Sequence, residues 1–229
     1  MFYMLKKLTN IFCCLLIACG FAACDELDTT WDPYHDWQDR NAQWFSMVAD
    51  SARQAIAEAK ATYGDAWADH CEWRMYKTLK KSQTSAGAKL TDSICVKIND
   101  RGHGTVLANY NDSVRLCFRG WLMETQYDNG DGQLFAEQKI FTQTYYGDFD
   151  PQTAAPSLSS VSAMIEGFQT ALQYMPEGSD WMVYIPQELA YGSKSETDIP
   201  AYSTLLFRIN MVAIYPAGTG VPGWKVRKK

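Results

Sequence analysis

The chain has 229 residues, with 21 basic and 26 acidic side chains, a net charge of −5 and 47% hydrophobic residues. Its length can bury a sizeable core, and its hydrophobic content excludes wholesale disorder. The acidic balance argues against nucleic acid as a partner. Only three scattered histidines are present, His35, His70 and His103, which argues against a histidine-rich metal site.

An export signal is predicted over residues 1–24. Two lysines precede an apolar run over residues 8–23, which is shorter than the roughly 20 apolar residues of a membrane span. The run ends in small residues before Cys24, and acidic residues follow at once. This pattern resembles a bacterial lipoprotein signal, in which Cys24 would carry the lipid. Cys19 is a second candidate for lipidation, and a plain secretory signal is the other interpretation.

Removal of this segment leaves 19 basic against 26 acidic side chains. Three cysteines remain in the body of the chain, at Cys71, Cys95 and Cys117, and no CxxC pair occurs among them. The absence of CxxC argues against a zinc or thioredoxin-like site. An odd number of thiols means that at least one is free or pairs between chains. A disulfide between Cys95 and Cys117 stays open, because sequence gives no distance.

The first part of the exported chain is predicted to be a tether followed by helices. Residues 25–35 are acidic and aromatic, as expected of a solvated tether. Apolar residues then recur every three or four positions over residues 36–64, which predicts a helix of about 27 residues and about 40 Å. Packing on the following domain is the favoured interpretation of its apolar face, and an arm for dimerisation or client binding is the alternative. A second helix is predicted over residues 65–81, and a small-residue linker over 82–88.

After residue 90 the period of the apolar residues changes to two. Alternation over residues 94–98 and 114–118 predicts strands with one buried face, and two more strands are predicted at 181–185 and 204–214. One short helix is predicted over residues 163–175. The expected fold class is α+β, with an antiparallel sheet of about five strands wrapped around a short helix and preceded by a helical arm.

Four segments of the second half carry a family resemblance in their order along the chain. They read VRLCFRGWL over residues 114–122, IEGFQTALQYM over 165–175, YIPQELAYG over 184–192 and, after Ile199-Pro200, STLLF over 203–207. Together they resemble the FKBP-type peptidyl-prolyl isomerases, in a style similar to lipoprotein members found in Bacteroidota. The resemblance covers roughly residues 90–216.

The resemblance implies an aromatic cup that binds the proline ring of an Xaa-Pro segment, with no metal and no cofactor. Turning an Xaa-Pro amide breaks no bond, so no nucleophile is required. The residues that the resemblance implies are Phe168 as the floor, Phe118, Phe141, Met164 and Phe207 as walls, and the Ile165 N–H and the Tyr191 hydroxyl as donors to substrate carbonyls.

Two positions depart from the family pattern. Phe118 stands where the family usually has tyrosine, and Thr142 stands where it usually has an acid after the wall phenylalanine. A different alignment of this wall uses Phe135 and Ala136, which also lacks the acid. One lost hydrogen bond typically costs about 0.5–1.5 kcal/mol. The departures therefore predict reduced turnover with proline binding retained.

The resulting prediction is a peptidyl-prolyl cis-trans isomerase anchored to the cell envelope, in the outer membrane with a periplasmic or surface face. Its expected partners are proline-containing clients and the membrane through the lipid, with a possible homodimer through the long helix. A proline-binding chaperone without turnover and a scaffold lipoprotein are the alternatives. The predicted organisation is a signal at 1–24, a tether and helical arm at 25–89, an isomerase domain at 90–216 and a basic tail at 217–229.

Overall fold

The computed structural model of the protein describes residues 32–84, 87–128 and 133–224. Residues 33–229 make up one unit of the chain, and residues 1–32 make up another. The predicted signal with Cys24, most of the predicted tether and the basic end of the tail lie outside the described residues. None of the described helices is both long and apolar enough to cross a bilayer.

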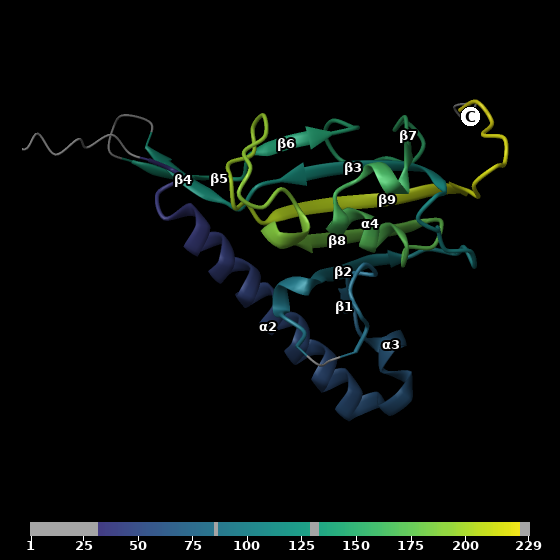
Figure 1. Ribbon diagram of the computed structural model, residues 1–229, viewed down its shortest axis with the longest axis horizontal. Coiled ribbons are helices and arrows are strands. Elements are labelled where there is room, and N and C mark those ends of the chain that lie inside the picture. Colours follow the sequence, from purple (N-terminus) through teal and green to yellow (C-terminus); the bar gives the residue numbers. More distant parts are fainter. Residues whose placement is uncertain (1–31, 85–86, 129–132, 225–229) are drawn as a thin grey trace, which may run out of the picture. The chain divides into compact units, whose positions relative to one another are not determined.

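An antiparallel sheet forms the centre of the larger unit (Figure 1), in the order β1-β2-β8-β9-β3-β6, with β7 also paired to β3. A separate two-stranded sheet, β4-β5, extends beyond one end of it. The strands are β1 Trp73–Lys77, β2 Ser93–Arg101, β3 Ser113–Trp121, β4 Thr125–Asp128, β5 Leu134–Glu137, β6 Ile140–Gln143, β7 Ser157–Ser160, β8 Ser179–Ile185 and β9 Leu205–Tyr215. The α+β class is confirmed, and the main sheet has seven strands rather than about five.

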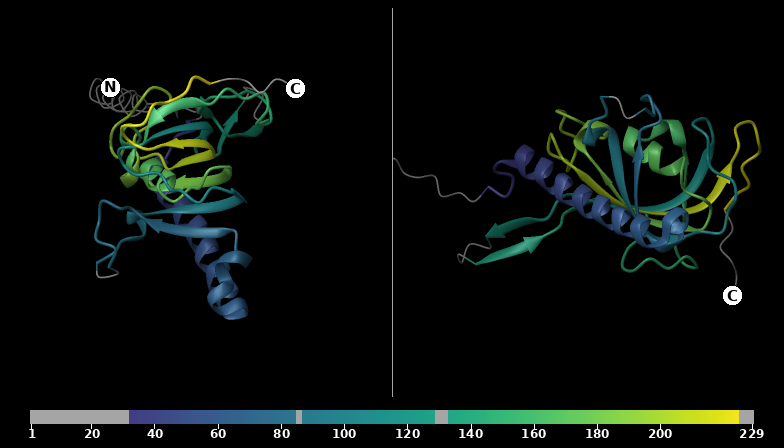
Figure 2. Two further views of the ribbon diagram at one scale, coloured as in Figure 1. Left: turned by 90° about the vertical axis from the view of Figure 1, so that its right-hand side faces the viewer. Right: turned by 90° about the horizontal axis from the view of Figure 1, so that it is seen from below.

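The helices lie on opposite faces of this sheet (Figure 2). They are α2 Trp37–Tyr63, α3 Trp67–His70 and α4 Glu166–Leu172, with single 3-10 turns at Gly64–Ala66, Leu90–Asp92, Val161–Ala163 and Gln187–Leu189. Alternating residues of β2 show the two faces, because Ile94 and Val96 join the core under α4 while Cys95 packs with Phe45 and Ala49 of α2. The predicted helix over 36–64 is confirmed as α2. The helix predicted over 163–175 is shorter, because Met164 and Ile165 have extended backbone angles and the helix runs only from Glu166 to Leu172.

The helix predicted over residues 65–81 is wrong beyond His70. Residues 73–77 form β1, which pairs antiparallel with β2 from Trp73 opposite Lys97 to Lys77 opposite Ser93. Trp73 and Met75 pack toward α2, and Tyr76 packs on the other face, against the main core. Both faces of the strand therefore meet apolar neighbours, and its spacing of aromatic residues fits a helix equally well. The sheet begins at β1, before residue 90.

The long helix α2 is packed on the sheet, as the favoured interpretation predicts. Phe45 and Ala49 are buried against the sheet. At the start of the helix, the Trp37 indole N–H donates to the Ser203 hydroxyl at 2.9 Å in a buried contact. The Thr204 backbone N–H donates to the Asn41 side-chain oxygen at 2.9 Å. These bonds join α2 to the segment that leads into β9. Dimerisation through α2 stays a prediction.

The three body cysteines are all free and buried, so the Cys95–Cys117 disulfide that sequence left open is not formed. Cys95 lies on β2 and Cys117 on β3, and two other strands separate these in the sheet order. Burial raises the pKa of the Cys95 thiol to about 12. This thiol therefore stays protonated at neutral pH.

The short helix α4 lies unusually close to β8. A β-carbon at Gly167 would meet Cγ2 of Ile185 at 2.3 Å, a distance that real contacts do not reach. Gly167 is therefore the residue that lets the helix seat on the strand. The side chains around this contact are fully buried, and each buried aliphatic side chain contributes about 1.5–3 kcal/mol to stability. They include Ile94, Val96, Leu172, Val183 and Ile185.

Replacing Gly167 with Ala should destabilise the protein. Helix propensity alone would favour Ala by about 1 kcal/mol. Overpacking against Ile185 should cost about 1–3 kcal/mol and outweigh it. Urea unfolding followed by tryptophan fluorescence measures the net change.

The control for this substitution is Gly220→Ala, because a β-carbon at Gly220 meets nothing within 4 Å. In an Ile185→Ala background the Gly167→Ala change should cost less, since the clashing methyl is gone. A stabilised Gly167→Ala protein, or an equal cost in both backgrounds, would show that the close approach of α4 does not constrain the fold.

Candidate active site

One cavity of about 540 Å³ lies among α4, strands β9, β3 and β6, and the loop between β8 and β9. We call it the phenylalanine cavity. Its lining residues are Phe118, Phe141, Thr142, Ala163, Met164, Ile165, Phe168, Tyr191, Glu196, Thr197, Ile199 and Phe207. All eight pocket residues named from sequence line it, and they come from β3, β6, α4 with the turn before it, β9 and the loop.

Phe168 of α4 and Phe207 of β9 form the buried base of the cavity, with 2% and 5% of their surfaces exposed. Their ring centroids are 4.9 Å apart at an interplanar angle of 88°, and Phe118 meets Phe168 edge-on at 5.7 Å. Edge-to-face contacts of this kind are the favoured geometry for aromatic pairs. The seating of α4 on β8 thus holds Phe168 against two rings of the sheet.

Phe141 of β6 closes the base on another side, with its ring 5.4 Å from that of Phe207 at 88°. The two rings approach each other over Gly120 of β3. A β-carbon at Gly120 would lie 2.7 Å from both rings, so this position has no room for a side chain. The alternative wall residue, Phe135, lies on β5 and is 39% exposed. It does not line the cavity, whereas Phe141 does.

Ile165 lies at the wall of the cavity as the N-cap residue of α4, with extended backbone angles (φ −61°, ψ 154°). Its carbonyl accepts the Gln169 N–H at 2.9 Å. Its own N–H has no hydrogen-bond partner among residues 32–84, 87–128 and 133–224. The first N–H groups of a helix lack intrahelical acceptors. This N–H is therefore available to a bound carbonyl.

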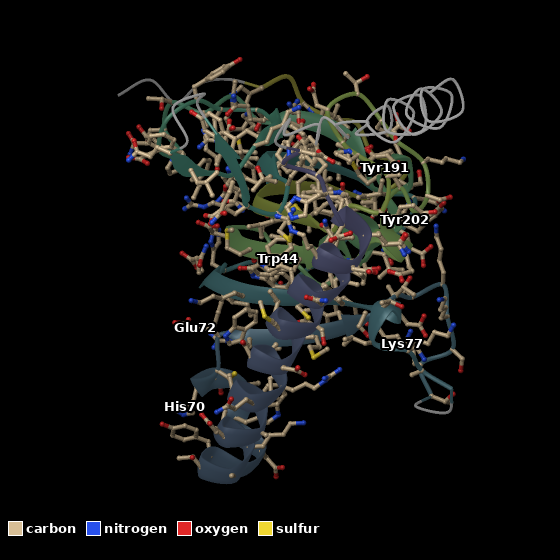
Figure 3. All side chains as sticks on the ribbon, turned by 90° about the vertical axis from the view of Figure 1, so that its left-hand side faces the viewer. Trp44, His70, Glu72, Lys77, Tyr191 and Tyr202 are labelled. Carbon is tan, nitrogen blue, oxygen red and sulfur yellow. The ribbon has the colours of Figure 1, made fainter. Side chains whose placement is uncertain are left out.

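Tyr191 lies on the loop that follows β8, and backbone hydrogen bonds hold this loop in shape. The Gly192 N–H donates to the Gln187 carbonyl at 2.9 Å, and the Tyr202 N–H donates to the Gly192 carbonyl at 2.7 Å. Figure 3 shows Tyr191 and Tyr202 at the same end of the molecule. Burial, and then the charge of Glu196, raise the pKa of the Tyr191 hydroxyl. The hydroxyl stays a donor at neutral pH.

The polar chemistry of the cavity is limited. Phe118 has no hydroxyl, and Thr142 presents no carboxylate opposite Gly120 on the neighbouring strand. Among the described lining residues there is no cysteine, histidine or lysine. The cavity can therefore hold an apolar ring and donate hydrogen bonds to carbonyls. It offers no nucleophile paired with a base.

Four lining residues were not named from sequence, and they are Ala163, Glu196, Thr197 and Ile199. Ile199 belongs to a motif that carried the resemblance, although no role followed from it. Glu196 and Thr197 sit in a loop without a recognisable motif. Their position depends on a short bridge between Glu196 and Ile199. No local sequence pattern indicates that bridge.

Comparisons with known proteins identify related sequences. The family model for FKBP-type peptidyl-prolyl cis-trans isomerases matches residues 104–212. The FKBP-type 22 kDa peptidyl-prolyl cis-trans isomerase of Escherichia coli is 29% identical over 168 residues, which cover 72% of this chain and 66% of that protein. Outer membrane protein MIP of Legionella longbeachae is 28% identical over 158 residues, covering 64% and 68%. The match thus spans about two thirds of the length of these curated relatives.

Among solved structures, FkpA of Escherichia coli matches 93% of this chain and 82% of its own, at 20% identity and a TM-score of 0.44. Residues 104–212 of the chain make up an FKBP-type peptidyl-prolyl cis-trans isomerase domain.

Proposed function

We propose that this protein catalyses cis-trans isomerisation of Xaa-Pro bonds in proline-containing polypeptides, and that the phenylalanine cavity binds the proline ring. One observation carries the proposal: the edge-to-face base of Phe168 and Phe207 lies beneath a wall with two available donors. In this proposal Phe168 is the floor and Phe118, Phe141, Met164 and Phe207 are the walls.

The reaction needs stabilisation of a twisted amide and nothing more. An amide rotates over a barrier of about 18–20 kcal/mol, and an Xaa-Pro bond takes tens of seconds or longer unaided. A rate increase of about 10⁴-fold requires about 5.5 kcal/mol of differential stabilisation. The planar amide has the larger dipole, because resonance is lost as the bond twists. An apolar cavity that replaces water therefore favours the twisted state.

Hydrogen bonds to carbonyls beside the bond hold the substrate while the amide turns. In this proposal the Ile165 N–H and the Tyr191 hydroxyl donate to two different substrate carbonyls. Both groups are fixed by the fold, Ile165 at the start of α4 and Tyr191 on a hydrogen-bonded loop. Fixed donors need little reorganisation when the substrate arrives.

The second candidate function is proline binding with little or no turnover. The absence of a hydroxyl at Phe118 and of a carboxylate at Thr142 favours it. Each missing hydrogen bond corresponds to about 0.5–1.5 kcal/mol. The two losses reduce the rate without removing the apolar surface that binds the ring, so binding and turnover are separable.

We further propose that the protein acts at the cell envelope, held through a lipid on Cys24. The cysteine follows small residues and precedes an acidic run, as in lipoprotein signals. One relative is named an outer membrane protein, which supports the same location. Stable anchoring requires more than one acyl chain. A lipid-modified N-terminal cysteine meets that requirement.

Turnover of a short Xaa-Pro peptide, measured without a coupling protease, tests the catalytic proposal. Tyr191→Phe should lower kcat/KM about 2- to 12-fold, because one hydrogen bond is lost. The matched control is Tyr146→Phe, since Tyr146 is 86% exposed and does not line the cavity. If the wild-type rate equals the uncatalysed rate in buffer while a proline-mimicking macrocycle still binds, the catalytic proposal is overturned. The second candidate function, proline binding without turnover, is then supported. No turnover and no binding would overturn both candidates.

Restoring the missing polar groups should raise activity. Phe118→Tyr combined with Thr142→Asp places a donor and an acceptor on neighbouring strands, and should increase kcat/KM about 2- to 12-fold for each hydrogen bond that forms. Thr153→Asp is the control for added charge, because Thr153 is exposed and outside the cavity. Unchanged kcat/KM in a double variant that still folds would contradict the roles given to these positions.

Cys24→Ser should release the protein from the membrane fraction of its host and abolish labelling by a fatty-acid analogue. Cys19→Ser is the matched control, and it should leave both unchanged. Fractionation with metabolic labelling measures the outcome. Loss of labelling in the Cys19 variant alone would move the lipid to Cys19, and labelling in neither wild type nor variant would exclude the anchor.

A further inference from the structure

The phenylalanine cavity is lined by one charged side chain, Glu196, to which the family resemblance gave no role. Of its described lining residues, Glu196 alone is charged at neutral pH, since Tyr191 keeps its proton. The remaining lining side chains are apolar apart from the hydroxyls of Thr142, Tyr191 and Thr197. A substrate entering the cavity therefore meets apolar walls and a single carboxylate.

The backbone around Glu196 is held in a defined shape. The Glu196 N–H donates to the Ile199 carbonyl at 2.9 Å, and the Ile199 N–H donates back to the Glu196 carbonyl at 3.1 Å. Asp198 turns the chain between them with a positive φ of 67°. These contacts place Glu196 and Ile199 side by side on the cavity wall.

An ion pair ties this turn to the neighbouring strand. The Lys139 ammonium group lies 2.8 Å from the Asp198 carboxylate, just before β6 with its Phe141. Lys139 is therefore paired with Asp198 and not with Glu196. Within the described ranges the Glu196 carboxylate has no ion-pair or hydrogen-bond partner in the protein. Its negative charge is available to a bound molecule.

Glu196 lines the same cavity as Tyr191. Its charge is the second cause, after burial, of the raised pKa of the Tyr191 hydroxyl. In the proposed function that hydroxyl donates to a carbonyl of the substrate backbone. Because both residues line one cavity, we expect side chains that flank the bound Xaa-Pro bond to approach the Glu196 carboxylate.

We infer that Glu196 is a specificity-determining residue that favours substrates with a lysine or arginine next to the proline and disfavours those with an acidic residue there. The inference rests on the proposed function. Because Glu196 is exposed, an ion pair with it gives a modest preference that salt screens. Apolar walls on one side strengthen the interaction relative to bulk water.

Two peptide series test the inference, with Lys, norleucine or Glu placed immediately before the proline in one and immediately after it in the other. The readout is the ratio of kcat/KM for the Lys peptide to that for the Glu peptide at low salt. For the wild type we expect a ratio of about 2 to 10 in at least one series. Glu196→Gln should bring this ratio close to 1, and 0.5 M salt should lower it in the wild type.

Glu188→Gln is the matched control. Glu188 is an exposed residue of the 3-10 turn in the same loop, it does not line the cavity, and its loss changes the net charge equally. The ratio should stay at the wild-type value in this variant. A ratio that both variants lower alike would assign the preference to net charge and overturn the inference.

The same peptides distinguish a failure of the inference from a failure of the proposed function. Turnover of the norleucine peptides with a Lys-to-Glu ratio near 1 in both series would overturn the inference alone. Rates equal to buffer for every peptide would overturn the proposed catalysis. In that case calorimetry measures the dissociation constants of the Lys and Glu peptides for the wild type and for Glu196→Gln. An equal Lys-to-Glu preference in the two proteins would overturn the role of Glu196.

Discussion

The close approach of α4 to β8 is the constraint on which the cavity depends. Gly167 leaves no β-carbon between the helix and Ile185, so the helix can lie directly on the strand. The next residue, Phe168, is thereby held edge-on to Phe207. Ile165 stands at the start of the same helix with its N–H available. A helix displaced by one methyl group would move the floor of the cavity and a proposed donor together, because both belong to one rigid element.

The other walls of the cavity are supported by residues that do not line it. Gly120 allows the rings of Phe141 and Phe207 to meet over β3. On the opposite face of the sheet, α2 holds the entry to β9 through Asn41 and Thr204. The helical arm is therefore part of the support for the cavity, and it is more than a spacer between the predicted tether and the sheet. A reaction that depends on fixed donors and an apolar wall requires support of this kind.

Patterns of neighbouring residues in the sequence predicted the elements whose structure depends on neighbouring residues. Strand β8 alternates between buried and half-buried residues, as its sequence predicts, whereas consecutive residues of β2, β3 and β9 are buried on both faces. The family resemblance placed eight residues around one cavity. Strand β1 was predicted as a helix, because both of its faces meet apolar neighbours and only its pairing with β2 selects the strand. Glu196 was not predicted at all. Its place depends on a bridge to Ile199 and on an ion pair between Asp198 and Lys139, which are 59 residues apart.

The central claim is that the proline ring sits on Phe168 while the Ile165 N–H binds the neighbouring carbonyl. An NMR titration of the labelled protein with a short Xaa-Pro peptide tests it most directly. The account predicts nuclear Overhauser contacts between the prolyl ring protons and the rings of Phe168 and Phe207, with a large downfield shift of the Ile165 amide proton. Contacts from the prolyl ring to another surface, with the Ile165 amide unshifted at saturation, would contradict it.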